Sequence, residues 1–434
     1  MAQNNSYLLL IFNILYVLFT PLILLCFIFI PKKKDRLIWG PDPLISNKYW
    51  SEAMKRAGYA SQTVMSEYYS INRREDYDVY YDDMIPRWIR LKPLRKALGP
   101  LFGFLYMIRH AKIVHLPLSG GPLGISVLWK LEAHLFRWAG IKTVLIPYGS
   151  DAYIYSQIID LSLRNGLLLS YPDAARKEAS IAKRVHYWVK HADAMVTGIM
   201  MDGIGRWDVA SPSVLMIDTS EWKEKEEYSM ADGRNGPVRV MHTPNHRGFK
   251  GTEFLIQATD ELVQEGLQIE LVLLEKVPND RVRELMQEVD ILAEQFIVGY
   301  AMSALEGMAS GLPVLSNLDN EAYTRVFRRY SFLNECPILS TSPETIKDHL
   351  RALVTHPQLR KDLGEAGRKY VEKYHSYDTA KYLFGSIYRV ILDGEDIDLM
   401  NLFHPLKSAY VKATPRVVHP LQENRLPEEY LKST

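Results

Sequence analysis

Cysteine is scarce in this chain, and the signatures of several common enzyme classes are missing. Only two cysteines occur in 434 residues, Cys26 in an apolar N-terminal run and Cys336 far downstream. Their positions argue against a disulfide and fit a reducing compartment. No C-x-x-C pair or Cys/His cluster has the spacing of a zinc site. P-loop, G-x-S-x-G and H-E-x-x-H sequences are also missing, so no motif indicates a P-loop NTPase, a serine hydrolase or a zinc protease.

A strong excess of charge of either sign is missing as well. Lysine and arginine total 52 against 51 acidic residues, so the net charge is +1 and does not favour nucleic acid as a partner. Two Asp-x-Asp patterns, Asp76-Tyr77-Asp78 and Asp396-Ile397-Asp398, are of the kind that holds a metal in some transferases. Neither follows a buried strand, so we expect no metal and no resident cofactor. The length allows two ordinary domains.

Charged residues are missing altogether from Tyr7 to Ile30, and most of these 24 residues are apolar. A run of this length can cross a bilayer as one helix. Lys32, Lys33 and Lys34 follow it and no basic residue precedes it, so the positive-inside rule places the rest of the chain in the cytoplasm. A cleaved signal peptide has the opposite charge order. The sequence therefore predicts a single-pass anchor in the cell inner membrane or another membrane.

Acidic residues are missing between Met84 and Leu131, where eight basic residues occur. Over 87–112 several of these cations alternate with Trp88, Leu91 and other large apolar residues. A basic amphipathic surface suits an anionic leaflet or a lipid diphosphate. The alternative is an ordinary core helix with solvated cations.

Strand-like apolar runs alternate with helical patterns through the rest of the chain, which predicts an α/β protein with parallel sheets. The expected organisation is an anchor with a basic flank (1–36), a first α/β domain (37–218), a linker rich in charged residues (219–237), a second α/β domain (238–385), and a C-terminal helix with an extended or poorly ordered tail (386–434). The strands expected in the second domain are Val238–His242, Ile269–Leu274, Gln295–Val298 and Val314–Ser316.

The stretch 294–317 carries the most information about function. A short strand is followed by Gly299, a short helix containing Glu306, a stop at Gly311 and Pro313, and a further strand. Such a turn directs unpaired backbone N–H groups into the space above the strand, which suits an anion such as a diphosphate. An ordinary βα unit with a solvated glutamate is the alternative.

This stretch resembles the donor-nucleotide motif of the retaining GT-B glycosyltransferases known as group 1. That family has two glutamates separated by seven residues, followed by Met-Ala-x-Gly-x-Pro-Val. Glu306 and the run 308–314 match, whereas Val298 stands where the first glutamate belongs and Glu294 lies just upstream. The resemblance implies two Rossmann-like domains facing a cleft, with the last helices crossing back onto the first. It also implies that Glu306 holds ribose and that Gly299 and Tyr300 lie against phosphate or sugar.

Two cations precede this motif by about 55 residues, as they do in that family. Arg247 and Lys250 lie in the loop after the first strand of the second domain. The resemblance implies that they hold the donor diphosphate. Fixed cations there would stabilise the charge of the leaving group without a metal. A basic surface loop beside a helix start is the alternative.

Two candidates for the acceptor side lie in the first domain. Asp151 belongs to a Gly-Ser-Asp loop that follows a buried strand, and it suits either an acceptor hydroxyl or a helix cap. His115 ends another strand, where a histidine is either a catalytic group or a structural one.

The resemblance implies a metal-independent glycosyltransferase that moves a sugar, with retention, from a nucleotide-sugar to an acceptor. The apolar run Tyr7–Ile30 and the basic stretch 87–112 add the expectations of a membrane anchor and of a lipid-linked or cell-surface polysaccharide acceptor. Two alternatives remain open: a non-catalytic nucleotide-sugar-binding subunit of a membrane assembly, and a sugar-nucleotide epimerase of the same fold.

Overall fold

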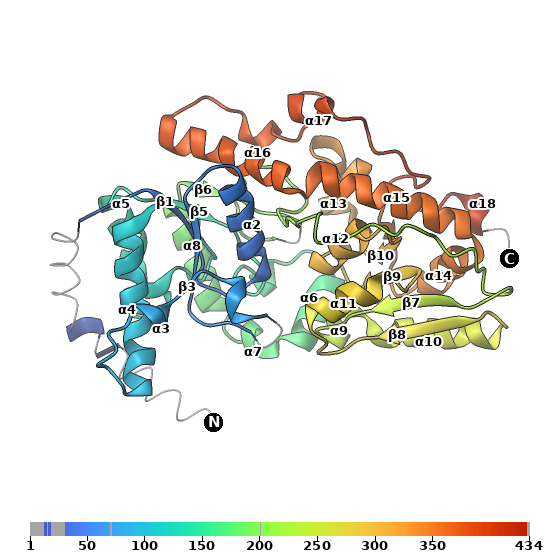
Figure 1. Cartoon of the computed structure of the whole chain (residues 1–434), viewed down its shortest axis with the longest axis horizontal. Helices are drawn as coiled ribbons and strands as arrows, with labels where there is room; N and C mark the ends of the chain where they lie inside the picture. Colours follow the sequence, from blue (N-terminus) through green and yellow to red (C-terminus); the bar gives the residue numbers. More distant parts are fainter. Residues whose placement is uncertain (1–12, 15, 19–30, 70–71, 200, 432–434) are drawn as a thin grey trace.

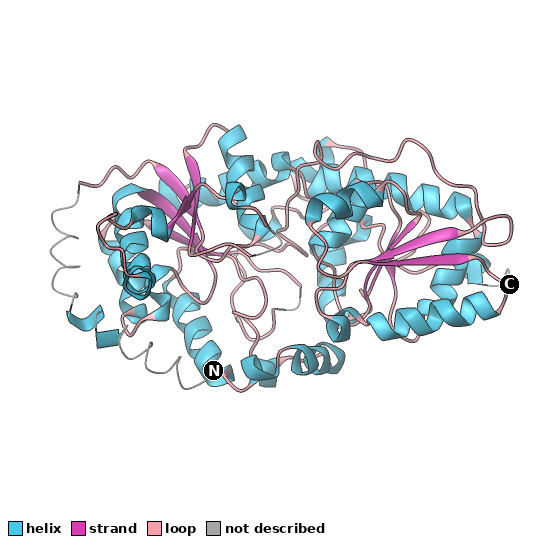
Figure 2. Ribbon diagram, turned by 60° about the horizontal axis from the view of Figure 1, so that its bottom comes forward, coloured by secondary structure: helices cyan, strands magenta, loops and turns pink. Residues whose placement is uncertain are grey.

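The computed structural model describes residues 13–14, 16–18, 31–69, 72–199 and 201–431. Two parallel sheets, each covered by helices, form two α/β domains that lie side by side (Figures 1 and 2). This arrangement confirms the expected α/β architecture of GT-B type.

The first sheet has the order β3-β2-β1-β4-β5-β6, with all described pairs parallel. Its strands are β1 (Arg36–Trp39), β2 (Ser61–Met65), β3 (Val79–Tyr80), β4 (Ala111–Leu116), β5 (Lys142–Leu145) and β6 (Ala194–Met195). Its helices are α2 (Ile45–Arg56), α3 (Tyr81–Met84), α4 (Lys92–His110), α5 (Trp129–Trp138), α6 (Leu161–Ser170), α7 (Pro172–Ala175) and α8 (Glu178–His191).

The second sheet has the order β11-β10-β9-β7-β8 and is also parallel. Its strands are β7 (Val238–His242), β8 (Ile269–Leu273), β9 (Ile291–Gln295), β10 (Val314–Ser316) and β11 (Leu339–Ser340). The helices that follow are α9 (Arg247–Lys250), α10 (Thr252–Gln264), α11 (Asn279–Met286), α12 (Met302–Ala309), α13 (Glu321–Tyr330), α14 (Ile346–Thr355), α15 (Pro357–Tyr374), α16 (Tyr377–Tyr388), α17 (Ala409–Ala413) and α18 (Glu428–Leu431).

Each sheet has one point where the chain changes direction across it. In the first sheet, successive strands run outward from β1 on one side and from its neighbour β4 on the other. In the second sheet the corresponding neighbours are β7 and β9. Loops at the carboxyl ends of such neighbouring strands diverge and leave a crevice, which is where open parallel sheets bind ligands.

Helix α16 returns from the second domain to the first and packs on α2 (Figure 1). The ring of Phe384 in α16 meets the edge of Trp39 in β1, with centroids 4.9 Å apart. The hydroxyl of Tyr388, at the end of α16, lies 2.8 Å from His115 Nε2. The crossing helix expected from the resemblance is therefore present, and it begins within the region assigned to the second domain.

The prediction of a strand at Gln295–Val298 is wrong, because β9 ends at Gln295 and a turn follows. The backbone carbonyls of Phe296 and Ile297 each accept a hydrogen bond of 2.9 Å from the side-chain amide of Asn317. The side-chain amide of Gln295 likewise donates a hydrogen bond to the backbone carbonyl of Val298. Side chains thus satisfy the carbonyls that a strand would offer to its neighbours.

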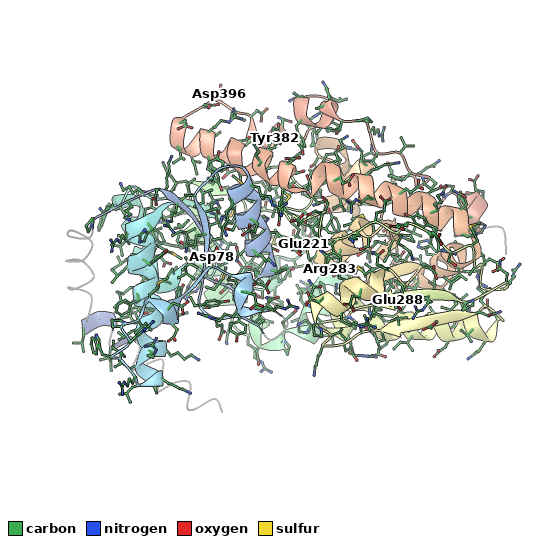
Figure 3. The ribbon with its side chains drawn as sticks, in the orientation of Figure 1. Asp78, Glu221, Arg283, Glu288, Tyr382 and Asp396 are labelled. Carbon is green, nitrogen blue, oxygen red and sulfur yellow. The ribbon has the colours of Figure 1, made fainter. Side chains whose placement is uncertain are left out.

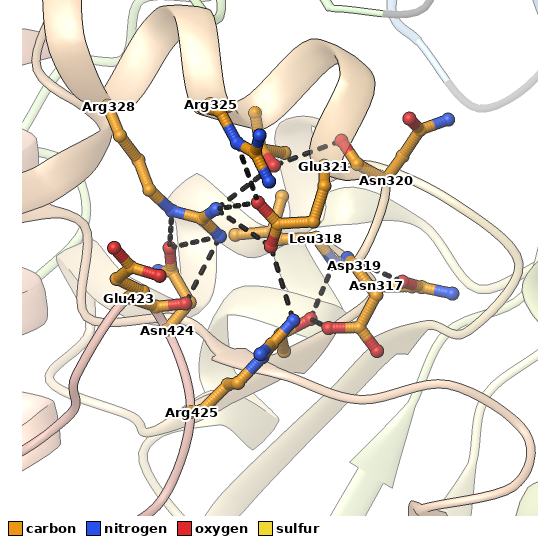
Figure 4. Close-up of polar contacts among 12 residues, drawn as sticks. Asn317, Leu318, Asp319, Asn320, Glu321, Arg325, Arg328, Glu423, Asn424 and Arg425 are labelled. Atoms are coloured by element: carbon orange, nitrogen blue, oxygen red, sulfur yellow. Dashed lines mark hydrogen bonds and ion pairs between the residues drawn. The ribbon is translucent and has the colours of Figure 1, made fainter.

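The C-terminal tail, expected to be extended or poorly ordered, packs against the second domain over its described residues. Val417, Leu421 and Leu426 are buried against the second domain. Asn424 donates to the carbonyls of Cys336 and Ile338 at 2.8 and 3.1 Å, and so ties the tail to the β11 edge of the sheet. Figure 4 shows this tail segment joined to α13 through an arginine–glutamate network.

Most of the predicted membrane span, Tyr7–Ile30, lies outside the described residues. Among the residues that are described, no helix is long and apolar enough to cross a membrane. Within the span, Tyr16 is buried against the apolar core of the first domain.

The stretch 87–112 forms the end of a loop followed by α4, and most of α4 is a core helix. Its apolar face, including Leu101 and Phe104, is buried in the first domain. The exposed apolar residues lie just before the helix, where Trp88 is 79% and Leu91 is 70% exposed. The core-helix alternative therefore describes most of α4. The exposed apolar residues of the amphipathic alternative lie in the loop before it.

Candidate functional site

The carboxyl edges of the two sheets face each other. The Asn320 side chain, which follows β10, donates to the Asp160 carboxylate, which follows β5, at 2.8 Å. The hydroxyl of Tyr323 likewise contacts the carboxylate of Asp202. Because ligand loops lie at this edge in parallel sheets, the candidate residues of both domains border one interface.

The two predicted cations are the first and last residues of the short helix α9, which follows β7, and their environments differ. Arg247 is half-exposed and pairs with two partly exposed carboxylates, Glu253 at 2.8 Å and Glu275 at 3.3 Å. Lys250 is only 5% exposed, and its ammonium pairs with the buried carboxylate of Glu294 at the end of β9. The solvated partners of Arg247 can be displaced by an incoming anion, whereas Lys250 is already neutralised within the protein.

Glu294 connects three parts of the predicted donor region. Its Oε1 accepts from Ser303 in α12 at 2.8 Å, and its Oε2 accepts from Ser316 in β10 at 2.9 Å. Lys250 supplies the third partner. A buried carboxylate needs such partners because it has lost the stabilisation of water. Glu294 therefore fixes α9 against the start of α12.

The glycine turn has the backbone conformation that the sequence indicates. The Gly299 N–H and the Tyr300 side chain, however, are engaged within the protein. Gly299 has φ 71°, where a side chain would be strained. Its N–H donates to the carbonyl of Asn317 at 2.6 Å and is therefore occupied. The Tyr300 side chain is buried, and its ring lies edge-on to His375 with centroids 6.2 Å apart. Tyr300 is thus a buried core residue.

Glu306 lies inside α12 and is 6% exposed. Burial raises the pKa of its carboxyl to about 7, against the opposing effects of Asn279, Arg283 and Lys250. The amide of Asn279 in α11 lies 3.5 Å from Oε1, at the limit of a hydrogen bond. Arg283 is in turn paired with Glu221 at 3.5 Å, and Figure 3 labels both residues between the two sheets. Glu306 is therefore a weakly satisfied carboxyl that can accept further hydrogen bonds.

Val298 occupies the position where the related enzymes have their first glutamate. It is 2% exposed and packs with Tyr153, Leu163 and Leu167 of the first domain. The approach of α6 is close, because a Cβ at Gly166 would lie 2.9 Å from Ile297. The turn after β9 is therefore covered by an apolar contact between the domains.

Asp151 ties two loops of the first domain together. One carboxylate oxygen accepts from the N–H of Leu118 at 2.7 Å, and the other accepts from the N–H groups of Tyr148 and Gly149, both at 3.0 Å. Burial raises its pKa to about 6 although these bonds lower it. Three backbone donors already occupy this carboxylate, which favours the structural alternative over acceptor binding.

His115 is 2% exposed, and its ring stacks on Trp39 with centroids 3.5 Å apart. Nδ1 lies 3.1 Å from the carbonyl of Ile38, which can only accept, so Nδ1 carries the proton. Nε2 therefore accepts from Tyr388, and burial lowers the pKa of the imidazole to about 3. A neutral imidazole with both nitrogens bonded joins β4 to the crossing helix.

The sequence did not single out Asp42, which lies in the loop after β1 and lines a pocket with His115 and Tyr148. Burial raises the pKa of its carboxyl above the ordinary value. The position of its loop could have indicated Asp42, because the loop follows β1, a strand at the direction change of the sheet.

The two Asp-x-Asp patterns are engaged in other contacts. Asp76 pairs with Lys48 at 2.8 Å, and Asp78 pairs with Lys55 at 2.9 Å. Asp396 lies far from Asp78, on the outer side of the molecule (Figure 3). Within the described ranges, no group of three or more His, Cys, Asp or Glu residues is arranged to hold a metal ion.

A family model matches part of the second domain. Residues 256–380, which contain Glu306 but begin after Lys250, match the family described as glycosyl transferase-like. The match confirms, over this segment, the resemblance to glycosyltransferases that the residues carry. No curated protein sequence matches the chain significantly.

Several solved structures are similar to the chain at low identity. Anabaena HepE in complex with UDP is 11% identical, with 81% of this chain and 98% of that chain covered and a TM-score of 0.46. The catalytic domain of starch synthase IV from Arabidopsis thaliana, bound to ADP and acarbose, is 9% identical, with 82% and 99% covered and a TM-score of 0.46. Acinetobacter baumannii MurG is 12% identical, with 82% and 99% covered and a TM-score of 0.40.

Proposed function

We propose that this protein is a membrane-anchored glycosyltransferase that moves a sugar from a nucleotide-sugar to a lipid-linked or cell-surface polysaccharide acceptor. The observation that carries the proposal is the position of Glu306. It is a buried, weakly satisfied carboxyl within a segment that matches a glycosyl transferase-like family, at the edge of the second sheet that faces the first domain.

In this proposal the donor lies across the direction change between β7 and β9. Ionised Glu306 accepts hydrogen bonds from the ribose hydroxyls. Arg247 leaves its solvated partners, Glu253 and Glu275, for the diphosphate. Lys250 contributes through the geometry of its pair with Glu294, and the positive end of the α12 dipole faces the same turn.

Catalysis would then rest on stabilising the leaving nucleoside diphosphate, whose charge grows as the glycosidic bond breaks. Arg247 supplies an exposed cation for that charge. We propose that the reaction is metal-independent and proceeds with retention, as the motif in 294–317 implies. The leaving phosphate itself would guide the incoming hydroxyl.

The acceptor and the membrane belong together in this proposal. The uncharged run Tyr7–Ile30 would anchor the chain, with the catalytic part in the cytoplasm. Exposed Trp88 and Leu91, flanked by Arg87 and Arg90, would rest on an anionic leaflet. Full-length protein should remain in membranes washed with alkaline carbonate, and its release by that wash would contradict the anchor.

The decisive experiment uses full-length protein in membranes with a panel of radiolabelled nucleotide-sugars and a lipid extract. Label should pass to the extract from one donor, also when EDTA is present. Glu306→Gln should abolish this transfer, while Glu261→Gln, on the remote exposed face of α10, should leave it unchanged. Equal transfer by wild type and Glu306→Gln would contradict the assigned role.

A second candidate is a non-catalytic nucleotide-sugar-binding subunit. It is favoured by two observations: Val298 replaces the first glutamate of the motif, and Lys250 is neutralised by Glu294. Donor binding that depends on Glu306, without transfer to any acceptor in the extract, would select this candidate over the enzyme.

A further inference from the structure

Helix α6 belongs to the first domain in sequence but lies against the second domain, next to α9 (Figure 1). Its N-cap is Asp160, which accepts from the N–H of Leu163 at 2.6 Å with one oxygen and from the Asn320 side chain at 2.8 Å with the other. Just after the helix, the ring of Tyr171 meets the ring of His246 edge-on, with centroids 4.7 Å apart. Both ends of α6 are therefore held to the second domain.

The middle of α6 covers the turn after β9. A Cβ at Gly166 would lie 2.9 Å from Ile297 Cγ2, so the helix and the turn are in close contact. Leu163 and Leu167, on the same side of the helix, pack with Val298. This turn borders the direction change between β7 and β9, across which the donor is proposed to lie.

The end of α6 covers the other border of the same place. A Cβ at Gly248, inside α9, would lie 3.9 Å from the Cβ of Leu169 and 3.7 Å from the hydroxyl of Ser170. Because α9 follows β7, the single helix α6 lies over both the segments between which a nucleoside diphosphate would bind. In this structure α6 therefore closes the proposed donor site.

The position of α6 depends on this contact. Asn165 and Gly166 stand in the helix interior, where both residue types lower helix stability relative to alanine. Leu163 and Leu167 are at most 1% exposed, and moving α6 away would expose them to water, which favours the closed arrangement when the site is empty. A ligand then binds only the fraction of molecules in which α6 has moved away.

We propose that α6 is a lid over the donor site, and that it must leave the turn 296–299 before a nucleoside diphosphate binds. This inference rests on the proposed function and adds a regulatory step at its donor site. Opening breaks the bond between Asp160 and Asn320 and separates α6 from α9. A change that favours the closed arrangement weakens the apparent affinity for the diphosphate, and a change that favours the open arrangement strengthens it.

A disulfide between α6 and α9 tests the closed arrangement. The Cβ atoms at 169 and 248 would lie 3.9 Å apart, within the range of natural disulfides. Purified full-length Leu169→Cys/Gly248→Cys in lipid nanodiscs is titrated with radiolabelled UDP, ADP, GDP and dTDP. We expect the oxidised protein to bind at least about tenfold more weakly than the same protein after reduction. Equal affinity of the two forms would overturn the inference. Leu169→Cys alone is the control and should bind equally in both forms.

Gly166→Leu tests the open arrangement. Leucine has no room against Ile297 and pushes α6 away, although it favours the helix itself. Its affinity should be about 3- to 10-fold higher than that of the wild type. Asn165→Leu, at the neighbouring exposed position, also favours the helix and should bind like the wild type. Unchanged or weaker binding by Gly166→Leu would overturn the lid. If that variant does not fold, Gly166→Ala replaces it, because its Cβ makes the same close contact.

The wild type distinguishes failure of the lid from failure of the proposed function. A wild type that binds none of the four diphosphates would refute the proposed function and this inference with it. A wild type that binds one of them, together with a double-cysteine variant that binds equally in both forms, would overturn the lid alone.

Discussion

The hydroxyl of Tyr388 donates a hydrogen bond of 2.8 Å to Nε2 of His115 across 273 residues of sequence. This bond joins the crossing helix α16 to a central strand of the first sheet. Both side chains are at most 2% exposed. The relationship between the two domains therefore depends in part on a single buried polar contact, which water cannot replace easily.

Replacing Tyr388 by phenylalanine should lower the free energy of unfolding by about 1–3 kcal/mol, because His115 Nε2 would be left buried without a donor. Urea denaturation of the full-length protein, followed by tryptophan fluorescence, measures this change. Tyr59→Phe is the matched control, since Tyr59 is 40% exposed and its ring lies 5.6 Å from Tyr388. Equal losses in the two variants would mean that the buried hydrogen bond is not responsible.

The buried imidazole of His115 should make the fold sensitive to acid. Burial lowers its folded pKa to about 3, whereas an unfolded histidine titrates near 6.5. Between these values the unfolded chain binds a proton that the folded chain does not, so stability falls as pH decreases from about 6.5. The slope from this group is about 1.4 kcal/mol per pH unit. The unfolding free energies of the wild type and of His115→Phe are measured between pH 6 and 4, and their difference isolates the contribution of His115. Parallel profiles would contradict the assignment.

The sequence predicted strands well where a short apolar run lies between breakers. The limits of Val238–His242 and Val314–Ser316 agree with β7 and β10. It failed at 296–298, which is equally apolar, because Asn317 captures the carbonyls there from 20 residues away. A long-range side-chain bond of this kind leaves no local signal.

The candidate site was predictable in its elements but less so in its charges. The glycine turn and the helix of Glu306 lie where the residues indicate, whereas Arg247 and Lys250, expected in a loop, belong to the short helix α9. The burial of Lys250 against Glu294 was not predictable, because it depends on the parallel pairing of β7 with β9.

Donor binding should depend on pH through Glu306. Burial raises its pKa to about 7, and the ionised carboxylate accepts from ribose hydroxyls more strongly than the neutral acid does. Affinity for a nucleoside diphosphate should therefore fall below pH 7, by at most about tenfold per pH unit. Glu306→Gln should bind about 10- to 100-fold more weakly at pH 8 and lack this component. Calorimetry measures the affinity of both proteins as a function of pH. The titration of the phosphate itself affects both profiles equally, so their difference isolates Glu306. Identical pH profiles would refute the role of Glu306.

The pair of Lys250 and Glu294 should behave as one unit in stability. Removing one partner leaves a buried, uncompensated charge, so Lys250→Met or Glu294→Gln should each cost about 3–5 kcal/mol. The double variant should cost clearly less than the sum, which a double-mutant cycle in urea reveals. Arg247→Ala breaks only solvated pairs and should change stability by about 1 kcal/mol or less. Additive losses for Lys250 and Glu294 would show that they are not coupled.

Restoring the missing glutamate of the motif should weaken this protein. Val298 is 2% exposed and packs on Leu163 and Leu167, so Val298→Glu would place a carboxylate in an apolar contact between the domains. The expected loss of unfolding free energy is roughly 2–5 kcal/mol. Val298→Ala, which removes volume but adds no charge, is the control and should cost less. Higher transfer activity with unchanged stability in Val298→Glu would show that the turn after β9 opens readily. The apolar cover over this turn would then be dispensable, and the departure from the motif would have no structural reason.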